Sequence, residues 1–194
     1  MNIALRVPRM TREHFLEWAE AQDKRYEFDG FEPVAMTGGS NNHSLICQAV
    51  YLALGTRLRG GSCRVLGPDA GLATVGNSVR YPDAVVSCTK SPGADRLVPS
   101  AVVVFEVLSP TSGRTDRIMK LREYRAVPSV LRYIILEHRS ADLLAMSRPH
   151  GGADWTATAL TAPDTLEMPE IGITVPVAEF YAGVDLPDLG TPDA

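Results

Sequence analysis

The sequence predicts an α/β fold in which helices pack on a mixed central sheet. Segments with helical periodicity alternate with strand segments along the chain. The nearly continuous apolar run at residues 101–108 is typical of a central strand covered on both faces. Shorter strand pairs separated by turn residues predict additional β-hairpins. No repeat or linker divides the chain, so we expect one domain over residues 1–194 with an ordered core at about 11–185.

Composition and charge exclude several classes of protein. The chain is 45% hydrophobic and 22% charged, which excludes disordered, collagenous and coiled-coil proteins. It shows neither an apolar run long enough to span a bilayer nor a signal-peptide core, so we expect a cytoplasmic protein without membrane contact. Three cysteines without C-x-x-C spacing lead us to expect reduced thiols. The formal net charge of -4 argues against general nucleic-acid binding but allows a local basic groove.

The first third of the chain predicts a helix, a hairpin and a longer helix. Residues 11–24 carry apolar side chains at helical spacing after Thr11, a suitable N-cap. Residues 25–37 alternate like a strand that is interrupted at Asp29 and Gly30, which predicts a β-hairpin. Ser40 can then cap a helix that continues to Gly60 and Gly61. The wide apolar stripe of this helix predicts packing against a sheet.

The rest of the chain predicts the core strands and the last helix. Residues 63–88 predict strands around a turn near Gly76 and Asn77, the second strand running from Val79 to Cys88. The central strand at 101–108 precedes a helix at 114–125, which Pro128 ends. The remaining expectations are a hairpin over 131–138 and 141–148, weaker strands near 155–160 and 171–175, and a loose tail after Asp185.

Two carboxylates stand within otherwise apolar strands, where a charge is costly unless it is paired or bound to a metal. Asp83 follows Tyr81 and Pro82, and Glu106 interrupts the central apolar run. Each has an ordinary alternative: Asp83 as a turn residue at a strand start, and Glu106 as a strand-end carboxylate paired with an arginine. Their occurrence together favours a shared site.

The predicted helix at 114–125 adds further polar groups. Asp116, Lys120 and Tyr124 are spaced at i, i+4 and i+8 and therefore share one face. A solvated ion pair between Asp116 and Lys120 is the alternative to a functional role. Lys120 is nevertheless one of only three lysines in an arginine-rich chain. A compact ammonium suits contact with a phosphate or a water at a reacting centre.

In combination, these residues resemble the PD-(D/E)XK nuclease superfamily. More narrowly, the chain resembles its family of small bacterial proteins labelled "putative restriction endonucleases". The resemblance covers about residues 11–185 and implies a restriction-endonuclease-like core with the activity of a Mg²⁺-dependent DNA endonuclease. The motifs that carry it are Tyr81-Pro82-Asp83, Glu106-Val107-Leu108-Ser109-Pro110, Lys120 with Tyr124, Tyr26-Glu27-Phe28-Asp29-Gly30, and Ser40 to His43.

The resemblance also implies a set of metal ligands. Asp83 and Glu106 would hold Mg²⁺, with Mn²⁺ as a substitute, and the backbone carbonyl of Val107 would be a further ligand. Hard oxygen donors of this kind suit Mg²⁺. Glu27 would lie near the same ion, although it could equally be the paired polar side of the hairpin. His43 would make a secondary contact.

The position of the lysine departs from the commonest pattern of the superfamily. There a lysine stands two residues after the strand carboxylate, a position that Leu108 occupies in this chain. The resemblance therefore implies that Lys120, from the following helix, positions the attacking water or stabilises the pentavalent phosphorus. Tyr124, on the same helix, would make a secondary contact.

The expected partners follow from this activity. DNA is the expected substrate, and a two-fold homodimer is expected because an enzyme that cuts both strands often has this symmetry. The glycine pairs lack Walker and dinucleotide spacing, so no nucleotide cofactor is expected. The rival hypothesis is a catalytically inactive nuclease-fold module that binds nucleic acid or a protein. The charge of -4 favours this rival, whereas Asp83, Glu106 and Lys120 together favour the enzyme.

Overall fold

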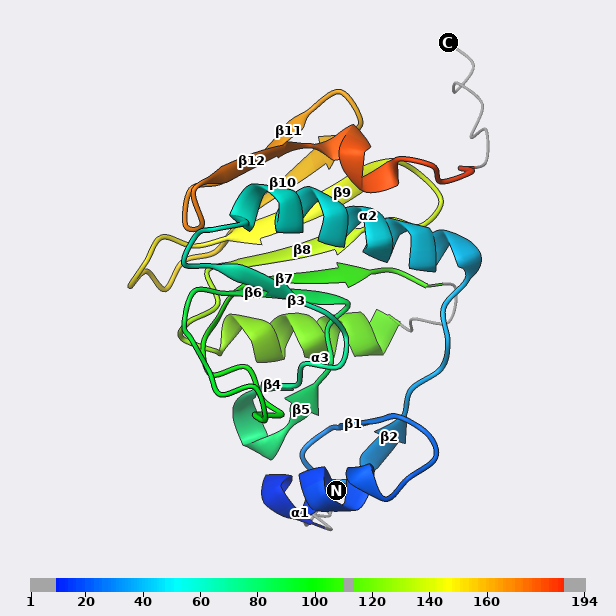
Figure 1. Cartoon of the computed structure of the whole chain (residues 1–194), viewed down its shortest axis with the longest axis vertical. Coiled ribbons are helices and arrows are strands. Elements are labelled where there is room, and N and C mark those ends of the chain that lie inside the picture. Colours follow the sequence, from blue (N-terminus) through cyan, green and yellow to red (C-terminus); the bar gives the residue numbers. More distant parts are fainter. Residues whose placement is uncertain (1–9, 110–113, 187–194) are drawn as a thin grey trace, which may run out of the picture.

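The computed structural model describes residues 10–109 and 114–186, and its centre is a six-stranded mixed sheet. The strand order is β10-β9-β8-β7-β6-β3, with β7 parallel to β8 and the other neighbours antiparallel. The predicted fold class, a mixed central sheet flanked by helices with additional hairpins, is confirmed (Figure 1). The six strands are β3 (Arg64–Leu66), β6 (Ala84–Ser87), β7 (Ala101–Val107), β8 (Arg132–Leu136), β9 (Asp142–Ser147) and β10 (Thr156–Thr161).

Helices α2 (Asn41–Leu58) and α3 (Arg114–Arg125) cover opposite faces of this sheet (Figure 1). Side chains alternate between the two faces along a strand. In β7, Val103 and Phe105 belong to the core under α2, whereas Val104 belongs to the core that contains Tyr124 of α3. The central strand is therefore covered on both sides, as its apolar sequence predicts.

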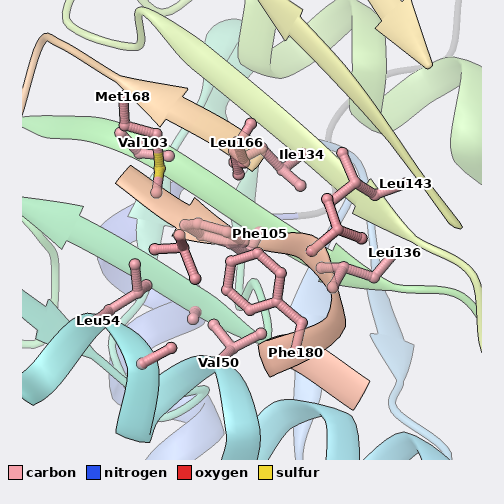
Figure 2. Packing of buried hydrophobic residues seen from close by; sticks show 14 of the residues in the cluster. Val50, Leu54, Val103, Phe105, Ile134, Leu136, Leu143, Leu166, Met168 and Phe180 are labelled. Atoms are coloured by element: carbon pink, nitrogen blue, oxygen red, sulfur yellow. The ribbon is translucent and has the colours of Figure 1, made fainter. Parts of the chain in front are cut away.

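The core under α2 holds the largest set of buried apolar side chains (Figure 2). Val50 and Leu54 of α2 pack with Phe105 and with Phe180 from the short helix η2 (Val177–Tyr181). Burial of such a side chain contributes about 1.5–3 kcal/mol. Ser40 begins α2 as predicted, since its side chain accepts a hydrogen bond from the backbone N–H of His43 at 3.2 Å. The core thus fixes the direction of α2 and the position of its first turn.

A second, four-stranded sheet has the order β2-β1-β5-β4. The predicted hairpin is confirmed, with Asp29 in the turn accepting the backbone N–H groups of Phe31 and Glu32, both at 2.8 Å. Gly30 has a φ of +90°, and a Cβ there would lie 2.3 Å from the carbonyl oxygen of Gly76, so only glycine fits. The strands are β1 (Tyr26–Phe28), β2 (Pro33–Ala35), β4 (Leu72–Ala73) and β5 (Val79–Arg80), and the turn at Gly76 is the short helix η1 (Val75–Asn77).

The first helix packs against this smaller sheet. α1 (Arg12–Glu20) begins after Thr11, whose side chain accepts the backbone N–H of His14. Phe15 is fully buried and stacks on Phe28 of β1, with 5.0 Å between the ring centroids. This contact anchors the hairpin from the side away from the main sheet (Figure 1).

The prediction of one continuous strand from Val79 to Cys88 is wrong. The chain leaves the smaller sheet after β5 and enters the main sheet at β6. Tyr81, Pro82 and Asp83 form the passage between the two sheets, and Pro82 has no N–H with which to continue a ladder. This passage places Asp83 at the junction of the sheets.

The C-terminal third follows the predicted order, with one addition. The hairpin of β8 and β9 is confirmed, and the expected weaker strands correspond to β10 and β12 (Ile173–Pro176). β12 pairs with β11 (Thr165–Met168), which the sequence did not predict. The tail expected to be loose falls mainly in residues 187–194, outside the described residues.

Two further findings concern the cysteines and membranes. Cys63 and Cys88 form a disulfide beside the paired strands β3 and β6, so the expectation of reduced thiols is wrong for this pair, and Cys47 is the free cysteine. In the part of the chain that the structure describes, no helix has both the length and the apolar character needed to cross a membrane.

Candidate active site

A cleft of about 340 Å³ opens where the hairpin, the first turn of α2, the main sheet and α3 approach one another. Six of the seven predicted site residues have atoms on its wall, whereas the fully buried Tyr124 does not line it. The six residues are Glu27, His43, Asp83, Glu106, Val107 and Lys120. The structure therefore brings together residues that are up to 93 positions apart in the sequence.

Asp83 is held in place by contacts to two elements, β7 and α2. Its Oδ2 accepts the backbone N–H of Val107 at 2.7 Å, and its Oδ1 lies 3.4 Å from Nε2 of His43. The hydroxyl of Tyr51 on α2 donates to its backbone carbonyl. These contacts direct the carboxylate into the cleft. The role of the Val107 carbonyl as a metal ligand stays a prediction.

Glu106 lies on the central strand and is only 9% exposed. Its partners are not arginines: Tyr124 donates its hydroxyl proton to Oε1 at 2.7 Å, and Nζ of Lys120 lies 3.3 Å from Oε1. Burial raises the pKa of Glu106 to about 7, against the opposing effect of Lys120 and with the support of the negative charge on Asp83 and Glu27. A carboxylate in this environment gains from a nearby cation.

Lys120 lies between two carboxylates. Its Nζ is 3.4 Å from Oε1 of Glu27 and 3.3 Å from Oε1 of Glu106, and its side chain is only 14% exposed. These contacts distinguish it from a solvated lysine, although the side chain of Asp116 lies outside the described residues. Burial, together with the charge of Glu106, raises the pKa of Tyr124. Lys120 and Tyr124 thus share one face of α3, as predicted.

Glu27 is fixed by a buried ion-pair network that the sequence did not predict. Its Oε1 accepts the backbone N–H of Tyr81 at 3.2 Å, and its Oε2 lies 3.1 Å from Nη1 of Arg80. Arg80 also binds both carboxylate oxygens of Glu123 at 2.7 Å, and Thr74 donates to Glu123 at 3.1 Å. The sequence does contain a signal for this network, because Arg80 is a charged residue within a predicted apolar strand. The same kind of signal identified Glu106.

His43 and Cys47 extend the site along α2. A hydrogen bond to Asp83 is the main cause that raises the pKa of His43, in opposition to the effect of burial. The Sγ of Cys47 lies 3.6 Å from Nδ1 of His43, and burial raises the pKa of this thiol. Sequence reasoning missed Cys47, although its position four residues after His43 on a predicted helix was a usable signal.

The charges of the site fit a divalent cation. The site and its supporting network hold four carboxylates, on Glu27, Asp83, Glu106 and Glu123, and the cationic side chains of Arg80 and Lys120, which gives a formal charge of -2 with His43 neutral. Carboxylate oxygens are the usual protein ligands of Mg²⁺. Asp83 and Glu106 both line the cleft, so both can offer oxygen atoms to a cation that enters it.

Comparison with known proteins adds three findings. Residues 12–178 match the family Uma2, which is described as "Putative restriction endonuclease". An "Uncharacterized protein slr1290" of the cyanobacterium Synechocystis is 30% identical over 180 residues, which cover 91% of this chain and 94% of that protein. The chain also superposes with a TM-score of 0.70 on the crystal structure of "a putative nuclease belonging to DUF820" from Anabaena variabilis, covering 89% of this chain and 98% of that one. At 11% identity, this last likeness shows the fold alone.

Proposed function

The chain belongs to the family described as "Putative restriction endonuclease", and we propose on this basis that it is a Mg²⁺-dependent endonuclease that hydrolyses phosphodiester bonds in DNA. The observation that carries the proposal is the convergence of Asp83, Glu106 and Lys120 on one cleft. These three side chains come from a sheet junction, a central strand and a helix, so their meeting is a product of the fold.

Asp83 and Glu106 hold the metal in this proposal, and the Val107 carbonyl is the further ligand. A bound Mg²⁺ or Mn²⁺ supplies Lewis-acid chemistry, since it lowers the pKa of a bound water and offsets charge on the scissile phosphate. The chain supplies the orientation. The Val107 N–H fixes one oxygen of Asp83, and the Tyr124 hydroxyl fixes one oxygen of Glu106.

Lys120 stabilises the reacting phosphate. As water attacks phosphorus and the bond to the leaving oxygen breaks, negative charge grows on the non-bridging oxygens. An ammonium held between Glu27 and Glu106 is already positioned for that charge and needs no rearrangement during the reaction. Glu27 therefore acts in this proposal as a positioning residue for Lys120.

A catalytically inactive module that binds nucleic acid or a protein partner is the second candidate. The formal net charge of -4 favours the protein-binding form of this candidate, because affinity for DNA depends on cationic contacts with phosphates. The two candidates differ in whether the metal and Lys120 are needed for a chemical product. One set of variants therefore separates them.

The test combines metal binding with DNA cleavage. Purified protein is titrated with Mn²⁺ by calorimetry and incubated with plasmid and linear DNA, with and without Mg²⁺ or Mn²⁺. Asp83→Asn should lose both metal binding and cleavage. Lys120→Ala should bind Mn²⁺ but cleave at least about 100-fold more slowly, the cost of losing one group that stabilises transition-state charge.

Lys90→Ala is the matched control, because Lys90 is exposed and lies outside the cleft. It should bind metal and cleave like the wild type. Unchanged Mn²⁺ binding in Asp83→Asn would reject the metal site. Cleavage at the wild-type rate by Lys120→Ala would remove Lys120 from the mechanism, and a wild-type protein that binds DNA without cutting it would favour the inactive module.

A further inference from the structure

A second group of metal-ligating side chains lies at the α2 side of the cleft, and its members His43 and Asp83 line the cleft wall. His43 and Cys47 lie one helical turn apart on α2, and the passage between the sheets brings Asp83 against them. One ligand atom from each of the three side chains lies within 4.8 Å of the other two. From this arrangement we propose that His43, Cys47 and Asp83 form a site for a borderline-soft divalent transition metal of the Zn²⁺ class.

The three side chains lie near the spacing of a tetrahedral zinc site, with one ligand atom of each within 4.8 Å of the other two. Zn–N bonds of about 2.0–2.1 Å and a Zn–S bond of about 2.3 Å place neighbouring ligand atoms about 3.3–3.6 Å apart. The Sγ of Cys47 is 3.6 Å from Nδ1 of His43, and Oδ1 of Asp83 is 3.4 Å from Nε2. Only one ring nitrogen binds the ion, so the three ligand atoms, which lie within 4.8 Å of one another, must move together by about 1 Å when the ion binds.

The donor types separate this site from the carboxylate site. A thiolate and an imidazole favour Zn²⁺ and Co²⁺, whereas Mg²⁺ and Ca²⁺ favour oxygen donors. Three protein ligands leave one position of a tetrahedral ion open to water or another donor. Cys47 is the residue that confers the selectivity, because it contributes the one soft donor of the three.

Asp83 belongs to both proposed sites, so a metal bound at the second site affects metal binding at the first. A Zn²⁺ ion that takes Asp83 removes a ligand from the proposed Mg²⁺ site. Zn²⁺ at this position should therefore inhibit Mg²⁺-dependent cleavage. This consequence rests on the proposed function, whereas the binding of Zn²⁺ itself does not.

Cobalt spectroscopy tests the site without any measurement of cleavage. Co²⁺ is added to the protein in the absence of small thiols, so that Cys63 and Cys88 stay in their disulfide and Cys47 is the one thiol among the three cysteines. We expect a thiolate-to-cobalt charge-transfer band in the near ultraviolet. Zn²⁺ should abolish the band by displacement, since it binds such sites more tightly than Co²⁺.

Three variants locate the signal. Cys47→Ser should lose the charge-transfer band, and His43→Gln should weaken Co²⁺ binding by at least about 10-fold. His14→Gln is the matched control, because His14 is exposed on α1, and it should keep the wild-type spectrum and affinity. Circular dichroism confirms that each variant is folded.

The absence of a band in the wild type, or a band that persists in Cys47→Ser, would overturn the proposal. A protein that shows the band but does not cleave DNA with Mg²⁺ would retain this site and lose the proposed function. A protein that cleaves DNA with Mg²⁺ but shows no band would retain the proposed function and lose this site.

Discussion

At the scale of single residues, Glu106 shows how burial in the sheet raises the pKa of a carboxyl group. The side chain lies on the central strand between the hydroxyl of Tyr124 and the ammonium of Lys120. These two donors offset only part of the effect of burial, so the pKa of Glu106 is raised to about 7. Without a cation, ionisation of this carboxylate opposes folding.

The metal-free protein should therefore show a pH-dependent penalty from Glu106. Its folded pKa lies above the ordinary value of 4.5, so between pH 4.5 and about 7 the folded state holds more protons and stability falls as pH rises. We expect Glu106→Gln to match the wild type at pH 5 and to exceed its free energy of unfolding at pH 8 by up to about 3 kcal/mol. Urea denaturation in the presence of a chelator measures this difference.

Saturating Mn²⁺ provides the control for this measurement. An ion at the proposed site should stabilise the wild type by binding its folded state, and Glu106→Gln lacks one of the proposed ligands. The order of stability at pH 8 should therefore reverse when the metal is added. A difference between the two metal-free proteins that shrinks as pH rises would contradict the expected role of burial.

Residues with a visible local conflict were the ones that the sequence identified. Asp83 and Glu106 interrupt apolar strands, and that conflict is evident without a structure. Arg80 shows the same conflict, but its role was missed because its partners, Glu27 and Glu123, are 53 and 43 positions away in the sequence. Only the folded chain shows that a strand arginine reaches both carboxylates.

At the scale of elements, Arg80 joins β5 to the hairpin and to α3. Its guanidinium contacts Glu27 of β1 and Glu123 of α3, and all three side chains are buried. Removal of a buried charge leaves its partners uncompensated, which costs more than the pair itself contributes. The network therefore fixes the smaller sheet against the helix that carries Lys120.

Arg80→Met should lower the free energy of unfolding by about 3–5 kcal/mol, because Glu123 is left buried without its main cationic partner. Adding Glu123→Gln should recover part of this loss, so the two changes should not be additive. Arg57→Met is the matched control: Arg57 pairs with Glu179 at 2.8 Å in a more exposed position, and its loss should cost about 0–1 kcal/mol. Additive effects of Arg80→Met and Glu123→Gln in urea denaturation would show that the network is not a unit.

Helices and sheets differed in how far local sequence determined them. α2 begins after Ser40 and α1 begins after Thr11, as their capping residues predict. The segment from Val79 to Cys88 has the composition of one strand, yet it belongs to two sheets. The sheet that a strand joins depends on which distant strand pairs with it, and the local sequence does not determine this pairing.

At the scale of the whole molecule, the proposed nuclease would cut a number of DNA strands that depends on the number of protomers. Each chain supplies one set of Asp83, Glu106 and Lys120, and two strands of opposite polarity are matched by two chains related by a two-fold axis. We expect sedimentation to show a homodimer, and plasmid cleavage by that dimer to yield linear DNA with little nicked intermediate.

Dilution tests this expectation. Below the dissociation constant of the dimer, the product should change from linear to nicked plasmid. A Lys120→Ala protein mixed in excess with the wild type should have the same effect, because mixed dimers carry one active site. Monomers at every concentration, with nicked DNA always preceding linear DNA, would refute the homodimer.

The short passage between β5 and β6 also determines where the chain can vary in length. Tyr81, Pro82 and Asp83 span at most about 10 Å when fully extended, so they act as a tether between the sheet that carries Glu27 and the sheet that carries Glu106. One inserted residue would turn Asp83 toward the opposite side of the chain, since successive side chains alternate. The exposed loop at residues 92–95 carries no such constraint. We therefore expect insertions to be tolerated in that loop but not in the tether, because the length of the tether sets the spacing of Asp83 and Glu106.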